Sequence, residues 1–281
     1  MTRWDFPCSD PIDIAIDNWA SGSIVLAGEP TDTVVVEVVP SSRSRGAEAL
    51  DEVEVEFDDG QLFVHGPRYG SFRRSSGLDL TIRTPVGSSC AAKTASADMS
   101  CVGEISSVTL TTASGDLTAS TVTGDVTARS ASGDVLLDQV GGDLTAHTAS
   151  GDVKANQVDG AVRVNSASGD VTLGYCARSV TTKTATGDVQ VGAVVSGEVE
   201  LNSASGDVEV AVVPGIGVYL ELSSLSGTVR SDLDEVETAE ATGPGGPTVE
   251  IRARTLSGDI HVTRAGTDRR DPGNPSPAEA E

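Results

Sequence analysis

Acidic residues beside glycines are the side chains of this sequence with the clearest chemical potential. A carboxylate follows a regularly spaced glycine at Asp116, Asp125, Asp134, Asp143, Asp152, Asp170, Asp188, Glu198, Asp207 and Asp259. Stacked carboxylates could bind calcium, which prefers hard oxygen ligands. The structural alternative is a turn in which Asp, Ser and Thr side chains accept bonds from local amides while glycine supplies a positive φ angle. We expect the structural role, because calcium-binding β-rolls have more glycines per repeat and a different Asp position.

The cysteines and histidines show no metal-site or redox spacing. Three of the four cysteines occupy positions expected to point inward as small buried side chains, Cys90, Cys101 and Cys176. Cys8 lies near the N-terminus, and no C-x-x-C pair occurs. The histidines are widely separated, at His65, His147 and His261, and His147 occupies the same repeat position as Arg129, which is expected to face solvent. We therefore predict no metal site and no cofactor.

Catalytic signatures are absent from the sequence: it contains no G-x-S-x-G, H-E-x-x-H, P-loop or G-x-G-x-x-G motif. Sugar hydrolysis needs two carboxylates in different environments, whereas these acids recur in nearly identical surroundings. We predict that the protein is not an enzyme and has no catalytic residues. A carbohydrate-active β-helix enzyme is kept as an alternative, because loops at 66–77 and 231–247 could hold a non-repeating pair.

The elements that carry these acids repeat with a spacing of nine residues. Glycines occur at 115, 124, 133, 142, 151, 160 and 169, and the frame later slips by one residue to Gly197 and Gly206. The second and fourth residues after each glycine are apolar or small, as in Val135 and Leu137. This alternation predicts short half-buried strands.

The complete repeat is a pair of nonamers. A Thr/Ser-Ala-Ser/Thr triplet recurs every eighteen residues, with its alanine at 113, 131, 149, 167 and 185, and the equivalent position of the other nonamer is larger, as at Val140. We expect the small and large residues to occupy opposite sides of a narrow coil. The sequence thus predicts an all-β, single-stranded right-handed parallel β-solenoid of about 18 residues per coil. About ten coils would form a rod of roughly 48 Å.

Three regions follow along the chain. Residues 1–87 are β-rich outside the nonamer frame, and we interpret them as an irregular N-terminal cap continuous with the solenoid. The solenoid occupies 88–263 and includes an acidic loop at 231–247. The tail at 264–281 is predicted to be disordered.

The charge balance restricts the partners. The chain of 281 residues has 42 acidic and 19 basic side chains, a net charge of −23, and only 3% aromatic residues. A polyanion or an anionic membrane would be repelled, so we predict no nucleic-acid binding and no direct anionic membrane binding. No secretory signal or membrane-spanning run is visible, which favours a cytoplasmic location and leaves envelope association through a partner as an alternative.

The segment Leu78–Gly87 followed by repeated Ser-Gly-Asp-Val units resembles the putative-adhesin β-solenoid family, a bacterial domain of unknown function also called the toastrack domain. Ser21–Leu26 is similar to that family's opening strands, and the resemblance covers about residues 10 to 263. It implies a β-solenoid, often tied to the cell envelope, with no catalytic residues to transfer. We therefore expect a non-enzymatic adhesin-like scaffold that binds a protein partner or itself, with a calcium-binding β-roll as the first alternative.

Overall fold

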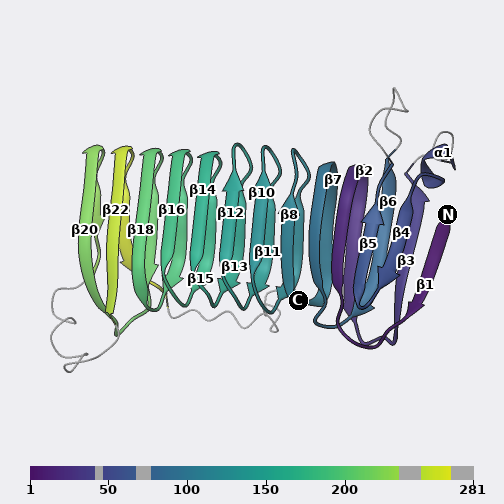
Figure 1. Cartoon of the computed structure of the whole chain (residues 1–281). Coiled ribbons are helices and arrows are strands. Elements are labelled where there is room, and N and C mark those ends of the chain that lie inside the picture. The colour runs from purple at the N-terminus through teal and green to yellow at the C-terminus, as the bar shows by residue number, and fades with distance from the viewer. Residues whose placement is uncertain (42–46, 68–76, 234–247, 267–281) are drawn as a thin grey trace, which may run out of the picture.

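The strands of this chain wind into a rod. The computed structural model describes residues 1–41, 47–67, 77–233 and 248–266. Strands lie across the long axis, and the N-terminal strands form one end of the rod (Figure 1). The predicted acidic loop lies largely outside the described residues, as does most of the predicted tail.

The middle of the rod consists of coils with two short strands each, as the repeat predicts. The strands on one side, here called the first face, are β8 (Ser107–Thr111), β10 (Val126–Ser130), β12 (Leu144–Thr148), β14 (Val162–Ser168), β16 (Val180–Thr186) and β18 (Gly197–Ser205). Those on the second face are β9 (Leu117–Val122), β11 (Val135–Val140), β13 (Val153–Val158), β15 (Val171–Cys176), β17 (Val189–Val194) and β19 (Val208–Val212).

Parallel pairing between equivalent residues confirms the eighteen-residue coil. Val126 pairs with Leu144 on the first face, and Val135 pairs with Val153 on the second. The one-residue slip lies in the turn between β17 and β18, because β16 pairs with β18 at a spacing of nineteen residues. The register shift between β17 and β19, at Val191 and Val194, restores the spacing of eighteen. The β-solenoid prediction is therefore confirmed, whereas its right hand remains a prediction.

Alternation along each strand builds the core. Val135, Leu137, Val153 and Ala155 are each at most 3% exposed, and the residues between them face solvent. Because coils stack in register, each inward side chain packs on its equivalents above and below, and fully burying a valine contributes about 1.5 kcal/mol or more. The interior is therefore a column of aliphatic side chains along the rod.

Two long strands complete the coils towards the N-terminus. β7 (Ser89–Ile105) pairs with both β8 and β9, so one strand spans a whole coil. β2 (Asp13–Glu29) pairs in parallel with β7 along most of its length, bends near Asn18 at a φ of 59°, and pairs on its other side with β5 (Gln61–His65) and β6 (Leu78–Pro85). Parallel stacking thus extends into residues 1–87.

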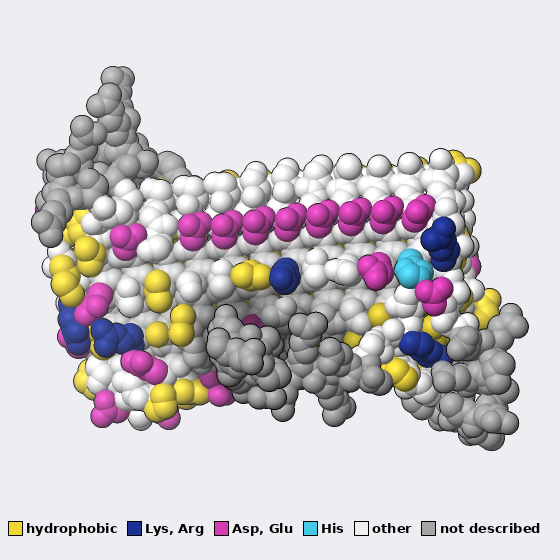
Figure 2. Space-filling view, turned by 180° about the vertical axis from the view of Figure 1, so that it is seen from behind, with side chains coloured by type: hydrophobic (Ala, Val, Ile, Leu, Met, Phe, Trp, Pro, Cys, Tyr) yellow, Lys and Arg dark blue, Asp and Glu magenta, His cyan; other side chains and the backbone are white. Residues whose placement is uncertain are grey.

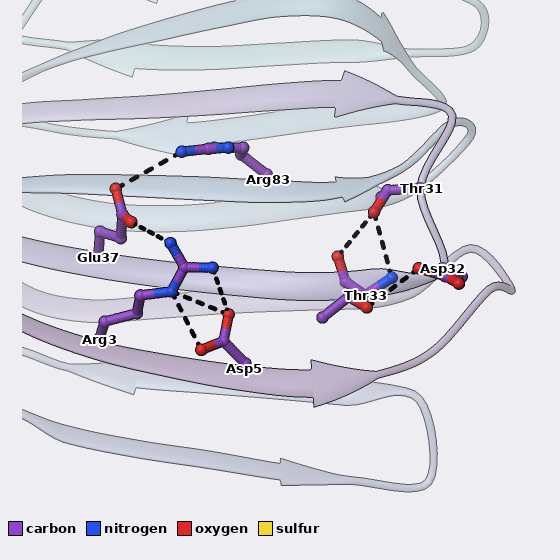
Figure 3. A network of polar contacts seen from close by, with 7 residues as sticks. All are labelled: Arg3, Asp5, Thr31, Asp32, Thr33, Glu37 and Arg83. Carbon is purple, nitrogen blue, oxygen red and sulfur yellow. Dashed lines mark hydrogen bonds and ion pairs between the residues drawn. The ribbon is translucent and has the colours of Figure 1, made fainter.

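Antiparallel strands close the N-terminal end. β3 (Thr33–Pro40) pairs with β6, β1 (Thr2–Pro7) pairs with β3, and β4 (Glu54–Asp58) forms a hairpin with β5; a short helix, α1, spans Ala47–Leu50. The hairpin turns at Asp59 and Gly60, both with positive φ, as Asp-Gly predicts. Arg3 bonds Glu37 on β3 at 2.7 Å, and Glu37 lies 3.7 Å from Arg83 on β6 (Figure 3). These ion pairs join the three outer strands.

The C-terminal coils are out of sequence order. β20 (Gly217–Ser226) and β21 (Val229–Ser231) precede β22 (Thr248–Ser257) and β23 (Ile260–Arg264) in the chain. In space, β22 lies between β18 and β20, and β23 lies between β19 and β21 (Figure 1). Along the chain, β20 and β21 therefore build the terminal coil, and the later strands β22 and β23 lie between that coil and the coil of β18 and β19.

Candidate functional site

The regularly spaced aspartates form a ladder of hydrogen bonds between coils. In each step, the Oδ1 atom of one aspartate accepts the backbone N–H of the equivalent residue one coil further along, at 2.7–3.1 Å. The ladder consists of Asp98, Asp116, Asp134, Asp152, Asp170, Asp188, Asp207 and Asp259, and ends at the N–H of Thr228. Figure 2 shows a straight line of acidic side chains along the rod.

A second, shorter ladder contains Asp125 and Asp143. Asp125 accepts the N–H of Asp143, and Asp143 accepts that of Ala161, both at 2.8 Å. The two ladders lie on opposite corners of the coil because each coil contains two nonamers. The prediction that these acids accept backbone amides is confirmed, but its local form is wrong. Each accepted amide belongs to the next coil and not to the aspartate's own turn.

The glycines before the aspartates have a different role from the one expected. In the middle coils, Gly115, Gly133 and Gly151 do not have a positive φ. A Cβ on Gly151 would lie 2.0 Å from the carbonyl oxygen of Gly133, one coil away. Close stacking of backbones at this corner therefore requires glycine, and among the glycines that precede ladder aspartates a positive φ appears from Gly187 onwards.

The Thr/Ser-Ala-Ser corner also differs from the prediction. The alanines at 131, 149, 167 and 185 are on the outside of the coil, and the hydroxyl residue before each alanine is the one that turns inward. Thr148 Oγ1 accepts the N–H of Gly151 at 2.8 Å, and Thr112 does the same for Gly115. The corner thus turns its small apolar side chains towards solvent.

The corner changes further along the rod. The amides of Gly169, Gly187 and Gly206 donate to carbonyl oxygens of the next coil instead of to a hydroxyl. The buried hydroxyls left without a hydrogen-bond partner at these corners are Ser166, Thr184 and Ser203. Competition for the glycine amide accounts for this difference.

Three thiols are confirmed inside the rod, at Cys90, Cys101 and Cys176. Burial raises the pKa of the Cys101 and Cys176 thiols to about 12 and holds that of Cys90 well above its usual value. These side chains are neutral and are shielded from reagents. Cys8 is only partly buried and its Sγ lies 3.4 Å from the carbonyl oxygen of Asp10.

The histidines do not come together. His65 lies on β5, His147 on β12 and His261 on β23. His147 is exposed opposite Arg129, as predicted, and His261 Nε2 lies 2.8 Å from Asp232 Oδ2. Within the described ranges, no three His, Cys, Asp or Glu side chains are arranged to hold a metal ion.

Among the depressions of the described surface, two lie on opposite faces of the rod. The first, here called the alanine depression, measures about 530 Å³ and is lined by Thr111, Thr112, Arg129, Ser130, Ala131, His147, Thr148, Ala149, Asn165, Ser166 and Ala167. The second, about 350 Å³, is lined by ladder aspartates with Thr172, Gln190 and Glu209. Its aspartates accept amides of neighbouring coils, and Gln190 Nε2 donates to Glu209 at 3.1 Å. These carboxylates therefore already form hydrogen bonds that join adjacent coils.

A model of the Toastrack DUF4097 family matches residues 10–263. The chain belongs to this family. The match confirms the resemblance identified from Leu78–Gly87 and the Ser-Gly-Asp-Val units. No curated protein matches this Toastrack chain. Where the structure is described, no helix has the length and apolar character needed to cross a membrane.

Solved structures similar to this Toastrack chain include two described as putative adhesins, from Bacteroides fragilis and Parabacteroides distasonis. They have 13% identity each and TM-scores of 0.35 and 0.36, and the alignments cover 93% and 92% of this chain and 96% of each of those chains. A "putative lipid binding protein" from Parabacteroides distasonis has 14% identity and a TM-score of 0.39, with 94% and 96% covered. The family assignment rests on the family match, because all three likenesses are low.

Proposed function

We propose that this Toastrack protein is a non-enzymatic scaffold that binds a protein partner, or a second copy of itself, through the outward side chains of its coils. The observation that carries the proposal is the ladder. Eight aspartates of one column, the most conspicuous chemical groups of the sequence, each hold an amide of the neighbouring coil. Their regular use supports a role in building a stiff rod.

The outward positions support the binding part of the proposal. Equivalent residues of successive coils lie about 4.8 Å apart and form a straight column along the rod. Because the side chains of an outward column face solvent, one of them can be replaced without changing the backbone. The column that contains Arg129, His147 and Asn165 varies in chemistry, whereas the inward column of Val126, Leu144 and Val162 does not. Repeat proteins use such extended surfaces for recognition.

A column scan tests this function. Outward residues of one column at a time are replaced by glutamate in the full chain, and the variants are compared for partner capture from the native host and for oligomeric state by analytical ultracentrifugation. We expect one column to abolish capture or self-association while the melting temperature stays constant. The proposal fails if no column changes either property.

A further inference from the structure

The middle strands of the first face carry cations without carboxylates, although the chain has a net charge of −23. Outward carboxylates return on this face at β18, with Glu198 and Glu200. The outward residues of β10, β12, β14 and β16 are Thr127, Arg129, Thr145, His147, Arg163, Asn165, Thr181 and Lys183. None of them is acidic. We call this set the basic face.

Elsewhere in the described chain, many cations are paired. Arg3 and Arg83 contact Glu37, Lys93 lies 3.3 Å from Asp17, and Arg252 contacts three glutamates near the C-terminal end. Arg129, Arg163 and Lys183 form no salt bridge within the part of the chain that the structure describes. With more than two acids for every base, unpaired cations gathered on one face indicate a surface suited to an external anion.

The carboxylates of the two aspartate ladders do not neutralise the cations of the basic face. Asp125 and Asp143, at one edge of the basic face, direct an oxygen to the amide of the next coil. The long ladder follows the other corner, since Asp134 comes after the turn that Gly133 N–H and Ser130 Oγ close. Exposed charges more than about 8 Å apart are largely screened at physiological salt, so an anion on this face interacts mainly with the cations that it touches.

The alanine depression is lined by residues of four successive coils of the same face. Arg129, His147 and Asn165 contribute nitrogen groups to it, and its apolar lining comes from Ala131, Ala149 and Ala167. No Phe, Tyr or Trp side chain lines it, so the planar groups offered to a sugar ring or a base are only those of His147 and Arg129. An extended polypeptide fits better, because carboxylates can reach the cations while small side chains contact the alanines.

We propose that the basic face and the alanine depression bind an acidic polypeptide segment rich in Glu or Asp and small apolar residues. This assignment rests on the proposed scaffold function and specifies the partner's chemistry. The peptide's carboxylates are attracted mainly to the cations that they touch. Two or three such exposed ion pairs contribute about 0.2–1 kcal/mol each. The complex is therefore weak and sensitive to salt.

The test uses the full chain and a fluorescein-labelled peptide of about twelve alternating Glu and Ala residues, long enough to cross four coils. Binding is followed by anisotropy in about 150 mM NaCl, where the aspartate ladders are largely screened from the peptide. We expect saturable binding that weakens about five-fold in the Arg129→Gln/Lys183→Gln variant. A matched variant, Lys154→Gln/Arg230→Gln, removes the same charge from outward positions of β13 and β21 and should bind as the wild type does.

Several results would overturn the inference. They are the absence of wild-type binding up to about 1 mM peptide, equal weakening in both variants, and tighter binding of alginate or single-stranded DNA than of the peptide. Circular dichroism confirms that both variants fold, as exposed substitutions allow. If the column scan still identifies a binding column, only the peptide assignment fails and the scaffold function stands.

Discussion

The aspartate ladder stabilises the rod through hydrogen bonds between coils and destabilises it through repulsion between neighbouring carboxylates. Replacing the carboxylate of Asp152 by an amide separates these two effects. Asp152 Oδ1 accepts the N–H of Asp170 at 2.8 Å, and Asp152 N–H donates to Asp134 Oδ1 at 2.9 Å. Asp152→Asn keeps an acceptor oxygen and removes the charge. Asp152→Ala removes both, so the pair of variants distinguishes hydrogen bonding from charge repulsion.

The magnitudes follow from the coil spacing. Ladder neighbours about 4.8 Å apart repel by about 0.9 kcal/mol each in water. A hydrogen bond to a charged group contributes about 1 kcal/mol more than one to a neutral group. Repulsion by two neighbours persists in about 10 mM salt and is mostly screened in about 1 M. Asp152→Asn should therefore raise the free energy of unfolding by about 0.5 kcal/mol at low salt and lower it by a similar amount at high salt.

Urea unfolding followed by circular dichroism at increasing NaCl concentrations measures this change of sign in the stability difference between Asp152→Asn and the wild type. Asp152→Ala should be about 1 kcal/mol less stable than Asp152→Asn at every salt concentration. Asp159→Asn is the control, because Asp159 accepts a bond from Gln157 outside the ladder and its equivalents one coil away are the uncharged Gly141 and Ala177. The reasoning is refuted if the Asn and Ala variants unfold alike, or if Asp152→Asn shows no greater salt dependence than the control.

Further predictions address the core, the corner and the thiols. Val171→Asp buries an unpaired charge at a site 1% exposed and should cost several kcal/mol or prevent folding, whereas Thr118→Asp on the surface should melt as the wild type does. Gly151→Ala should be destabilised by more than about 1 kcal/mol in urea, because its Cβ meets the Gly133 carbonyl; wild-type stability would contradict the close approach. A thiol reagent near pH 8 should modify only Cys8 in the folded chain and all four cysteines after unfolding. Since the raised pKa of the buried thiols favours their neutral form, the free energy of unfolding should fall between about pH 9 and pH 12, and a flat profile would count against it. Calcium should leave the melting temperature unchanged, and a chelator-reversible increase would instead support the β-roll alternative.

The eighteen-residue repeat is sufficient to predict most of the coil. Val135 and Leu137 could be assigned to the interior because an alternating pattern allows only one face of a strand to be buried. The slip before Gly197 is visible as one extra residue and lies in the turn between β17 and β18, where the pairing spacing changes from eighteen to nineteen residues. The surface is harder to predict, because the basic face emerges only when Arg129, His147, Asn165 and Lys183 are aligned at eighteen-residue spacing. The sequence prediction placed only His147 opposite Arg129 and missed the other two.

The direction of a side chain at a corner and the partner of a polar group depended on the tertiary structure. The sequence indicated that Asp152 would bind an amide, but the amide lies in a coil eighteen residues away, and local pattern carries no information about that choice. Gly151 is required by the approach of another backbone and not by its own φ.

The order of the last coils was also decided in three dimensions. Any coil with alternating valines can pair in parallel with any other, so the backbone pattern permits β22 at the end of the rod. In the structure Arg252 of β22 contacts Glu198 of β18 on one side and lies 3.5 Å from Glu221 of β20 on the other. Arg254 also contacts Glu221 and lowers the pKa of that carboxyl. The sequence by itself determined what each coil looks like, while contacts between coils decided where the last one lies, because stacking energy depends on neighbours in space and not along the chain.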